Sequence, residues 1–414
     1  MKARWRSKTG SCRLRFPSAP TLLFLFLALG SSVVGAAESN SPSEIVLGMS
    51  TVLSGNSGAL GQDMQRGVLA GLERANRTGE LKNLRLRLIA LDDGYEPTRA
   101  AINTRQLIET DGVLAMIGNV GTPTAVVTVP LAREEKTLLF APFAGGPILR
   151  NTPPDRYVIN FRASYDEETQ AIIDALIDTA GLKPEEIAFF TQKDNSAFSM
   201  GMTALERHGL KDPGTIIHVG YERNTLAVEG AVADLLTAES APRAVMMYGA
   251  YAPCAKFIRL CRDSKMNPLF LNVSFVGSSS LIEALGDTDA RVIVTQVVPS
   301  PSDDGIPVVR EYRTDLRALD PSASAGFGDL EGYIAARILT LALEKIQGAP
   351  TREAIIDALE GLGEFDIGLG EPLHLSRTEH QASHRVWPTL LTGGRFVPFQ
   401  WAEIAALAKA GSPR

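Results

Sequence analysis

The fold class is decided by residues 113–141, which read VLAMIGNVGTPTAVVTVPLAREEKTLLFA. An unbroken apolar run, Val113–Ile117, is followed by a glycine-rich loop, a helical stretch, Pro123–Glu135, and a second apolar run, Leu138–Ala141. Apolar runs without alternation are typical of parallel strands that are covered on both faces. A strand, a helix and a strand in this order form a βαβ unit. The stretch therefore predicts an α/β fold with a parallel sheet.

The same alternation of short apolar runs and helical stretches fills most of the chain. Before residue 162, the other expected strands are Ile45–Met49 and Leu84–Leu91. After it, the expected strands are Ile187–Thr191, Thr215–Val219, Ala244–Tyr248, Leu269–Val273 and Val292–Val297. A series of this kind on each side of residue 162 predicts two doubly wound α/β lobes.

The two lobes are expected to exchange chain segments. The segments Tyr157–Arg162 and Val292–Pro301 look extended, and we expect both to cross between the lobes. More than one crossing makes a hinge and leaves the first lobe discontinuous. The predicted boundaries are 44–161 with 298–368 for the first lobe, 162–297 with 369–400 for the second, and 401–414 for a C-terminal tail.

The first 37 residues have the pattern of a secretory signal peptide. Six basic residues and no acidic one precede a short apolar run, Leu22–Leu29, and small residues then give cleavage sites around Val34–Ala37. The apolar run is shorter than a bilayer crossing requires, which favours a cleaved leader over the alternative of a membrane anchor. Export to the periplasm is the expected outcome.

The charge balance argues against nucleic acid as a partner. Cleavage after Ala37 leaves 377 residues with 35 basic and 47 acidic side chains, a formal charge of −12. Such a surface repels the phosphates of nucleic acids and of anionic membranes.

No pattern in the sequence predicts a metal, a cofactor or a catalytic centre. Cys254 and Cys261 lie two helical turns apart, too far for a disulfide within one helix, and we expect them to be buried apolar side chains. The spacing of His374, His380 and His384 suits zinc only in a helix, and its surroundings favour a solvated connection. Because nucleophile and phosphate-loop motifs are also missing, the sequence predicts no enzyme and no cofactor.

Three strand ends lead into loops that are rich in glycine and small residues. They are residues 53–61, 118–124 and 141–147. In open α/β sheets, ligands bind beyond the carboxyl ends of the strands, and such loops present backbone N–H groups and helix N-termini to anionic groups. Each loop alone is also explained by tight turns. Three on one edge favour a ligand cleft.

Several short motifs follow one another between Glu44 and Phe399. They are Leu53-Ser54-Gly55, Asp92-Asp93 with Pro97, Leu107-Ile108, Ile117-Gly118 with Gly121, Ser274-Phe275-Val276-Gly277, Gln296-Val297-Val298-Pro299, Glu331-Gly332-Tyr333 and Gly394-Arg395-Phe396-Val397. Together they resemble the leucine/isoleucine/valine-binding proteins, which are type I periplasmic receptors of branched-chain amino-acid ABC transporters. The resemblance implies two lobes, three crossings and closure around a small ligand.

The loops and the resemblance together predict the residues that face the ligand. They are Ser54, Leu60, Gly121, Thr122, Phe143, Ala144, Gly145, Phe198, Tyr251 and Ser274. The resemblance implies a hydroxyl for the ligand carboxylate at Thr122 or Thr124, and aromatic contacts at Phe198 and Tyr251. No metal ligand is expected.

Three positions depart from the family pattern. Leu60 stands where the resemblance implies an aromatic side chain, Gly145 where it implies a threonine, and Ser274 where it implies an acid that pairs with the ligand ammonium. A buried ammonium without a partner is unfavourable. The residues therefore favour an apolar or aromatic carboxylate, an amide or another small organic molecule over leucine or valine.

The resemblance also implies how the protein acts. The closed form is presented to the membrane permease of an ABC transporter, and the protein itself is expected to be a monomer. A sensor of the same fold, read by a partner receptor, stays open as an alternative, as does a secreted α/β enzyme.

Overall fold

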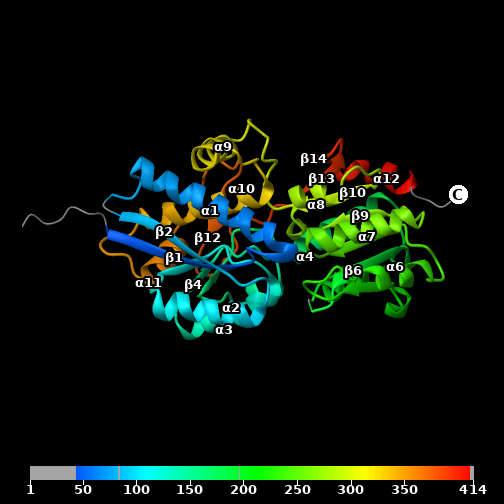
Figure 1. Cartoon of the computed structure of the whole chain (residues 1–414), viewed down its shortest axis with the longest axis horizontal. Helices are drawn as coiled ribbons and strands as arrows, with labels where there is room; N and C mark the ends of the chain where they lie inside the picture. Colours follow the sequence, from blue (N-terminus) through cyan, green and yellow to red (C-terminus); the bar gives the residue numbers. More distant parts are fainter. Residues whose placement is uncertain (1–42, 83, 195, 411–414) are drawn as a thin grey trace, which may run out of the picture. The chain divides into compact units, whose positions relative to one another are not determined.

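The computed structural model describes residues 43–82, 84–194 and 196–410 (Figure 1). The predicted leader, residues 1–37, and the last four residues of the predicted tail lie outside the described residues. None of the helices within those ranges combines the length and the apolar character that a bilayer crossing requires.

The strands and helices alternate as the sequence predicts. The strands are β1 (Ser43–Thr51), β2 (Leu84–Asp92), β3 (Ala115–Ile117), β4 (Leu138–Phe140), β5 (Val158–Ile159), β6 (Ile187–Gln192), β7 (His218–Tyr221), β8 (Ala244–Tyr248), β9 (Leu269–Asn272), β10 (Val292–Gln296), β11 (Gly363–Phe365), β12 (Leu373–Leu375), β13 (Trp387–Thr392) and β14 (Arg395–Pro398). The helices are α1 (Gly58–Thr78), α2 (Pro97–Arg105), α3 (Thr122–Glu134), α4 (Tyr165–Asp174), α5 (Ala197–Arg207), α6 (Glu229–Leu236), α7 (Tyr251–Asp263), α8 (Ser278–Leu285), α9 (Pro307–Leu319), α10 (Phe327–Leu343), α11 (Arg352–Glu360) and α12 (Ile404–Ala410).

The first sheet is parallel and has helices on both faces. Its order is β2-β1-β3-β4-β5, and every strand pair in it is parallel. Successive residues of β4 show the double cover, because Leu138 and Phe140 belong to the core beneath α1 and α10, whereas Leu139 belongs to the core beneath α3 and the segment that follows α2. In Figure 1, α2 and α3 lie together on one side of this sheet and α1 on the other.

The second sheet repeats this order and adds an antiparallel edge. Its strands run β14-β13-β10-β9-β8-β6-β7, and only β13 and β14 are antiparallel to their neighbours. In β6, Phe189 joins one core and Phe190 the other. The prediction of two doubly wound α/β lobes is confirmed.

One predicted strand is shifted toward the C-terminus at both of its ends. Instead of Thr215–Val219, β7 covers His218–Tyr221. The Asp212 carboxylate accepts a hydrogen bond from the Gly214 N–H at 2.9 Å, and Pro213 begins a short 3₁₀ turn there. Asp212 and Pro213 therefore hold the chain in a turn where the sequence predicts a strand.

Late helices pack against the first sheet. Helix α10 lies along α1, and the two backbones approach closely where glycines face them: a Cβ atom on Gly67 would lie 1.8 Å from the Asp329 carbonyl oxygen, and one on Gly332 would lie 2.4 Å from the Met64 carbonyl oxygen. These contacts agree with a discontinuous first lobe. The boundaries themselves stay a prediction.

The prediction of a solvated connection around the three histidines is wrong for residues 380–383. These residues are buried, and they lie along the connector that follows β5. The Asn160 N–H donates to the His380 carbonyl oxygen at 2.7 Å, and the Ala382 N–H donates to the Asn160 carbonyl oxygen at 3.0 Å. This backbone pairing removes the segment from water.

The expectation for the two cysteines is confirmed. Cys254 and Cys261 are fully buried on α7, and both are free thiols. Burial raises the pKa of the Cys261 thiol to about 12, so both act as apolar core side chains.

Candidate functional site

A small cavity lies between loops that follow strands of both sheets. Loops of the first sheet contribute Tyr95, Thr122 and Gly146, the start of α4 contributes Tyr165, and the second sheet contributes Gln192, Met200, Tyr248 and Phe275. Among the described residues that line it, none is charged. Its position beyond the carboxyl ends of the strands is where an open α/β sheet binds its ligand.

Aromatic rings form much of the wall. Phe275, from the loop after β9, lies among three rings of the first half of the chain. The ring centroids are 6.0 Å apart for Tyr95, 5.8 Å for Phe143 and 6.4 Å for Tyr165. Tilted and edge-on contacts at these separations are favourable for aromatic pairs. The cavity therefore suits an apolar or aromatic ligand body.

Two hydroxyl groups in this wall lack a hydrogen-bond partner among the described protein groups. They are Oγ1 of Thr122 and the phenol oxygen of Tyr165, and both atoms are buried. Burial raises the pKa of Tyr165 to about 12, although Arg162 opposes the shift, so the phenol keeps its proton. Thr124, the alternative to Thr122, instead donates its hydroxyl to the Gly121 carbonyl oxygen at 2.9 Å. Buried polar groups normally have partners, which makes the Thr122 and Tyr165 hydroxyls candidate ligand contacts.

Three further predicted residues line a second, smaller cavity of about 10 Å³. They are Leu60, Phe143 and Ser274. Because Phe143 lines this second cavity and packs on Phe275, which lines the first, the two rings separate the cavities.

The remaining predicted residues lie close by but line neither cavity. Ser54 donates its hydroxyl to the Asp92 carboxylate at 2.6 Å, and Gly121 precedes α3. Gly145 leaves room for Tyr165, whose Cδ1 would lie 2.3 Å from a Cβ at that position. Phe198 stacks on His218 with centroids 3.8 Å apart.

Two more predicted residues contact other parts of the chain. The Tyr251 hydroxyl accepts a hydrogen bond from the Ala59 N–H, at 3.4 Å. Ala144 is buried, and its carbonyl oxygen accepts a hydrogen bond from Arg150. The structure thus gathers Leu60, Thr122, Phe143 and Ser274 at the two cavities and leaves Phe198 and Tyr251 beside them.

Sequence reasoning missed several wall residues. Tyr95 follows β2 and Gln192 is the last residue of β6, so a search of every strand end would have found them. Tyr165 begins α4 and Phe275 follows β9 inside a quoted motif. Nothing in the sequence distinguishes the Phe275 ring from an ordinary core side chain.

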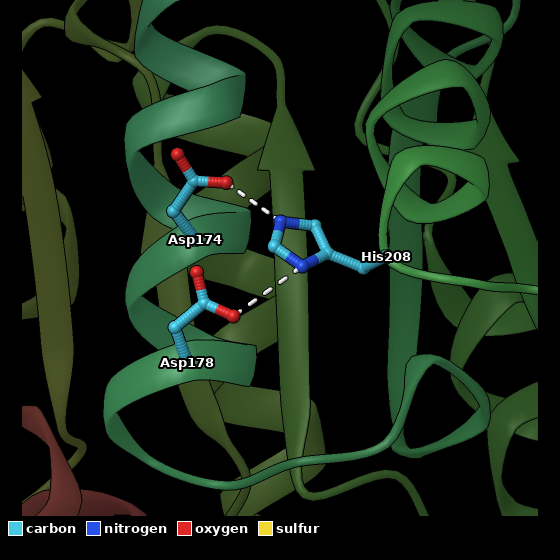
Figure 2. Close-up of side chains that lie close together, drawn as sticks. All are labelled: Asp174, Asp178 and His208. Carbon is cyan, nitrogen blue, oxygen red and sulfur yellow. Dashed lines mark hydrogen bonds and ion pairs between the residues drawn. The ribbon is translucent and has the colours of Figure 1, made fainter.

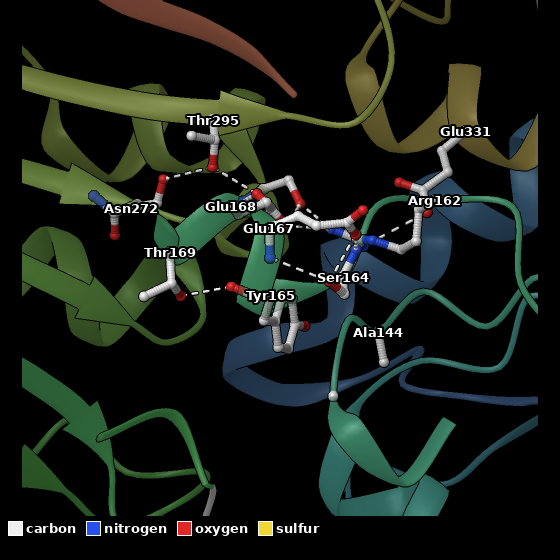
Figure 3. A network of polar contacts seen from close by, with 12 residues as sticks. Ala144, Arg162, Ser164, Tyr165, Glu167, Glu168, Thr169, Asn272, Thr295 and Glu331 are labelled. Atoms are coloured by element: carbon white, nitrogen blue, oxygen red, sulfur yellow. Dashed lines mark hydrogen bonds and ion pairs between the residues drawn. The ribbon is translucent and has the colours of Figure 1, made fainter. Parts of the chain in front are cut away.

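A buried charge network lies behind the aromatic wall, and the sequence did not predict it. Figure 3 shows next to one another the side chains of Thr295, Glu168, Arg162 and Glu331. Arg162 and Glu168 are fully buried, and their charged groups lie 3.3 Å apart; the distance from Arg162 to Glu331 is 3.5 Å. Burial alone would lower the pKa of Arg162, but the two carboxylates raise it above its ordinary value. Burial raises the pKa of Glu331 to about 7, with Arg162 opposing.

The sequence pattern of the periplasmic binding protein family matches residues 44–395. The chain belongs to this family. A solved structure of a possible leucine/isoleucine/valine-binding protein from Rhodopirellula baltica SH 1 is 46% identical, with a TM-score of 0.85, and the match covers 89% of this chain and 99% of that one. The recognition made from the short motifs is confirmed. As a periplasmic binding protein, the chain is not an enzyme.

More distant relatives share the same fold. Leu/Ile/Val-binding protein homolog 3 of Brucella melitensis biotype 1 is 24% identical over 350 residues, which are 83% of this chain and 92% of that protein. A fatty acid ABC transporter substrate-binding protein from Thermomonospora curvata is 20% identical with a TM-score of 0.75, and the match covers 89% of this chain and 94% of that one. At this identity the second likeness concerns the fold alone.

A histidine of this binding protein lies between two aspartates, away from the cavities. Figure 2 shows the His208 ring between Asp174 and Asp178 of one helical stretch. Nε2 lies 2.7 Å from the Asp174 carboxylate, and Nδ1 lies 3.5 Å from that of Asp178. The carboxylates lie at opposite ring nitrogens, and one metal ion binds only one of these. The contacts therefore hold the ring in place, and we assign no metal to them.

A second polar group joins the buried segment around residue 381 to the start of α4. Glu167 accepts hydrogen bonds from the Ser164 N–H at 2.6 Å and from Gln381 at 2.8 Å, and it lies 2.6 Å from His384. Burial would raise the pKa of Glu167, but these partners lower it to about 2. The bond to Glu167 raises the pKa of His384 above its ordinary value of 6.5, with burial opposing.

The His384 pair is expected to make the stability of this periplasmic binding protein depend on pH. Because the folded-state pKa of His384 is raised, its contribution is complete below pH 6.5 and is lost as the pH rises through the folded-state value. The Glu167 contribution is complete above its ordinary value of 4.5 and is lost as the pH falls toward about 2. We expect His384→Gln to lower the Tm more at about pH 5 than at about pH 8.5.

The control for this prediction is His374→Gln, which changes an exposed histidine of β12. Thermal unfolding of the three proteins across this pH range measures the difference. Equal losses of Tm at both pH values in His384→Gln would contradict the assigned ion pair.

Proposed function

We propose that this chain is an exported substrate-binding protein that captures a small organic ligand and delivers it to the permease of an ABC transporter. The ligand is an amino acid or a related apolar or aromatic carboxylate or amide. The likeness to leucine/isoleucine/valine-binding proteins and to an ABC transporter substrate-binding protein supports this proposal. The basic and apolar leader, residues 1–37, supports export to the periplasm.

The observation that carries the proposal is the pair of unpartnered hydroxyls in an apolar wall. The hydroxyls of Thr122 and Tyr165 are buried, and Thr122 also begins α3, a helix of 13 residues. Leaving a buried donor without a partner is unfavourable, whereas a ligand carboxylate or amide would accept from both hydroxyls. The positive end of the α3 dipole would add to the attraction of a carboxylate. The aromatic rings would enclose the ligand body.

The size of the cavity supports capture by closure. It measures about 30 Å³, far below the about 300–1,000 Å³ that is typical of small-molecule sites. A ligand of several carbon atoms enters only when the walls move apart. Contacts between the loop after β2 and the loop after β7 fit a closed form. Arg223 lies 2.5 Å from Glu96, and Asn224 donates to the Gly94 carbonyl oxygen at 3.0 Å.

The proposal is tested by removing each hydroxyl without changing the shape of its side chain. We expect Thr122→Val and Tyr165→Phe each to weaken binding about 10-fold or more, because a hydrogen bond to a charged group contributes about 1.5–3 kcal/mol. Calorimetry with leucine, phenylalanine, 3-phenylpropionate and phenylacetamide on ligand-free protein measures the affinities.

The control is Thr314→Val, which removes an exposed hydroxyl from α9, away from both cavities. Its affinities are expected to equal those of the native protein. Unchanged affinities in both cavity variants would contradict the assigned site, and turnover of a ligand would contradict the binding function.

A further inference from the structure

The Glu168 carboxylate lies behind the aromatic wall, and protein groups occupy all of its hydrogen-bond positions, two of them from Ser274. Both oxygens of Glu168 accept hydrogen bonds from this residue, from the Ser274 N–H at 2.7 Å and from its hydroxyl at 2.9 Å. The Thr295 hydroxyl donates to the same carboxylate at 2.5 Å, and Arg162 donates at 3.3 Å. A carboxylate offers about four acceptor positions. Glu168 therefore keeps none for a ligand.

A permanent positive charge stands beside this carboxylate. Arg162 also donates to the Ser274 hydroxyl, and its guanidinium lies 5.1 Å from the Phe143 ring centroid and 5.6 Å from that of Tyr165. Phe143 lines the second cavity and Tyr165 the first. The guanidinium thus faces the back of both aromatic walls. Its charge is balanced by the carboxylates of Glu168 and Glu331, so both of these acids are already engaged by the protein.

The other acids near the cavities are paired as well. Asp63 and Glu331 line the second cavity, where Asp63 lies 2.6 Å from Arg66 and Glu331 lies 3.5 Å from Arg162. Among the described residues, the first cavity has no acidic lining residue at all. A ligand ammonium in the first cavity would meet no carboxylate of the described lining residues, and the two acids that line the second cavity each already contact an arginine.

We propose that the buried pair Arg162–Glu168 makes this protein select against ligands with an ammonium group, so that it takes carboxylates without an amine. This inference rests on the proposed binding function and names its ligand class. The carboxylate of such a ligand would use the hydroxyls of Thr122 and Tyr165. Its apolar body would lie against the rings, as would that of an amino acid with the same carbon skeleton. The two compounds would therefore differ only in the amine.

Matched pairs of compounds test this selectivity on the native, ligand-free protein. The pairs are phenylalanine with 3-phenylpropionate and leucine with 4-methylpentanoate, titrated by calorimetry at about pH 7.5. We expect the compound without the amine to bind at least about 10-fold more tightly in one or both pairs, because a buried unpaired charge is unfavourable. Equal or tighter binding of the amino acids overturns this inference alone. No binding of any of the four overturns the proposed ligand class and this inference with it.

Two variants separate selectivity from a general loss of structure. Arg162→Met removes the charge but keeps a long side chain, and it leaves Glu168 with a free acceptor position; we expect the ratio of the two affinities to fall about 10-fold. The double variant Arg162→Met, Glu168→Gln removes both charges. We expect it to shift the ratio of the two affinities toward the amino acid by less than Arg162→Met alone does. A loss of affinity that is equal for both members of a pair, with the ratio unchanged, shows a purely structural role and overturns the proposal.

Discussion

Replacing Glu168 by alanine is expected to lower the free energy of unfolding by about 3–5 kcal/mol. Arg162 is fully buried, and Glu168 is the closer of its two carboxylate partners. Without Glu168, a guanidinium would stay in the interior with a single carboxylate partner, at 3.5 Å, and the Ser274 N–H and the Thr295 hydroxyl would lose their acceptor. Breaking one member of a buried pair has this cost because the other charge is left uncompensated.

The matched control is an acid that pairs with arginine at the surface. Glu353 lies 2.8 Å from Arg156, and its side chain is 48% exposed. Exposed pairs contribute about 0–1 kcal/mol, so Glu353→Ala is expected to have little effect. Urea unfolding of both variants, followed by circular dichroism, measures the difference. A loss in Glu168→Ala no larger than that in Glu353→Ala would contradict the assigned network.

The fold could be predicted because its strands are buried on both faces. In Leu138–Phe140, successive side chains enter two different cores, so all three must be apolar and the run has no gaps. The helices between such runs follow from the same rule, since each must cover one face of a parallel sheet. The error at β7 arose where the local turn at Asp212 and Pro213 prevailed over an apolar run.

Only those parts of the site that follow from the order of strands and helices along the chain could be predicted. Thr122 begins the helix that comes after β3, so its place at the carboxyl edge follows from the order of strand and helix alone. The chain order does not show which aromatic ring of the second sheet lies in the cavity wall. Phe198 packs against His218 and Phe189, whereas Phe275 packs against the wall residue Tyr95. Those choices depend on packing between segments far apart in sequence.

The charge network was not predictable for a related reason. Glu168 stands in the first turn of α4 beside two other acids, where acidic residues are common because they favour the helix N-terminus. Its burial depends on β9 and β10, and Arg162 reaches it from a connector that reads as a plain extended segment. A sequence pattern indicates neither that these two charges meet nor that Glu331 of α10 lies beside them.

The second large effect is expected from Gly67→Ala in the packing of α1 on α10. A Cβ atom at this position would lie 1.8 Å from the Asp329 carbonyl oxygen and 2.6 Å from its carbonyl carbon. Both are backbone atoms, so relief requires the two helices to move apart and opens gaps around Met64 and Val68 in the core. Because overpacking of a core costs about 1–3 kcal/mol and more where backbone must shift, we expect Gly67→Ala to lower the free energy of unfolding by about 3 kcal/mol.

The same substitution elsewhere should act in the opposite direction. Gly230 lies within α6, is exposed, and a Cβ there would have no neighbour within 4 Å among the described residues. Alanine is favoured over glycine inside helices by about 0.5–1 kcal/mol, so Gly230→Ala is expected to raise the Tm slightly. Thermal unfolding of the two variants and of the native protein shows whether each substitution lowers or raises the Tm. If Gly67→Ala unfolds at the same temperature as Gly230→Ala, then α1 and α10 do not approach as closely as described, and the first sheet must be covered in another way.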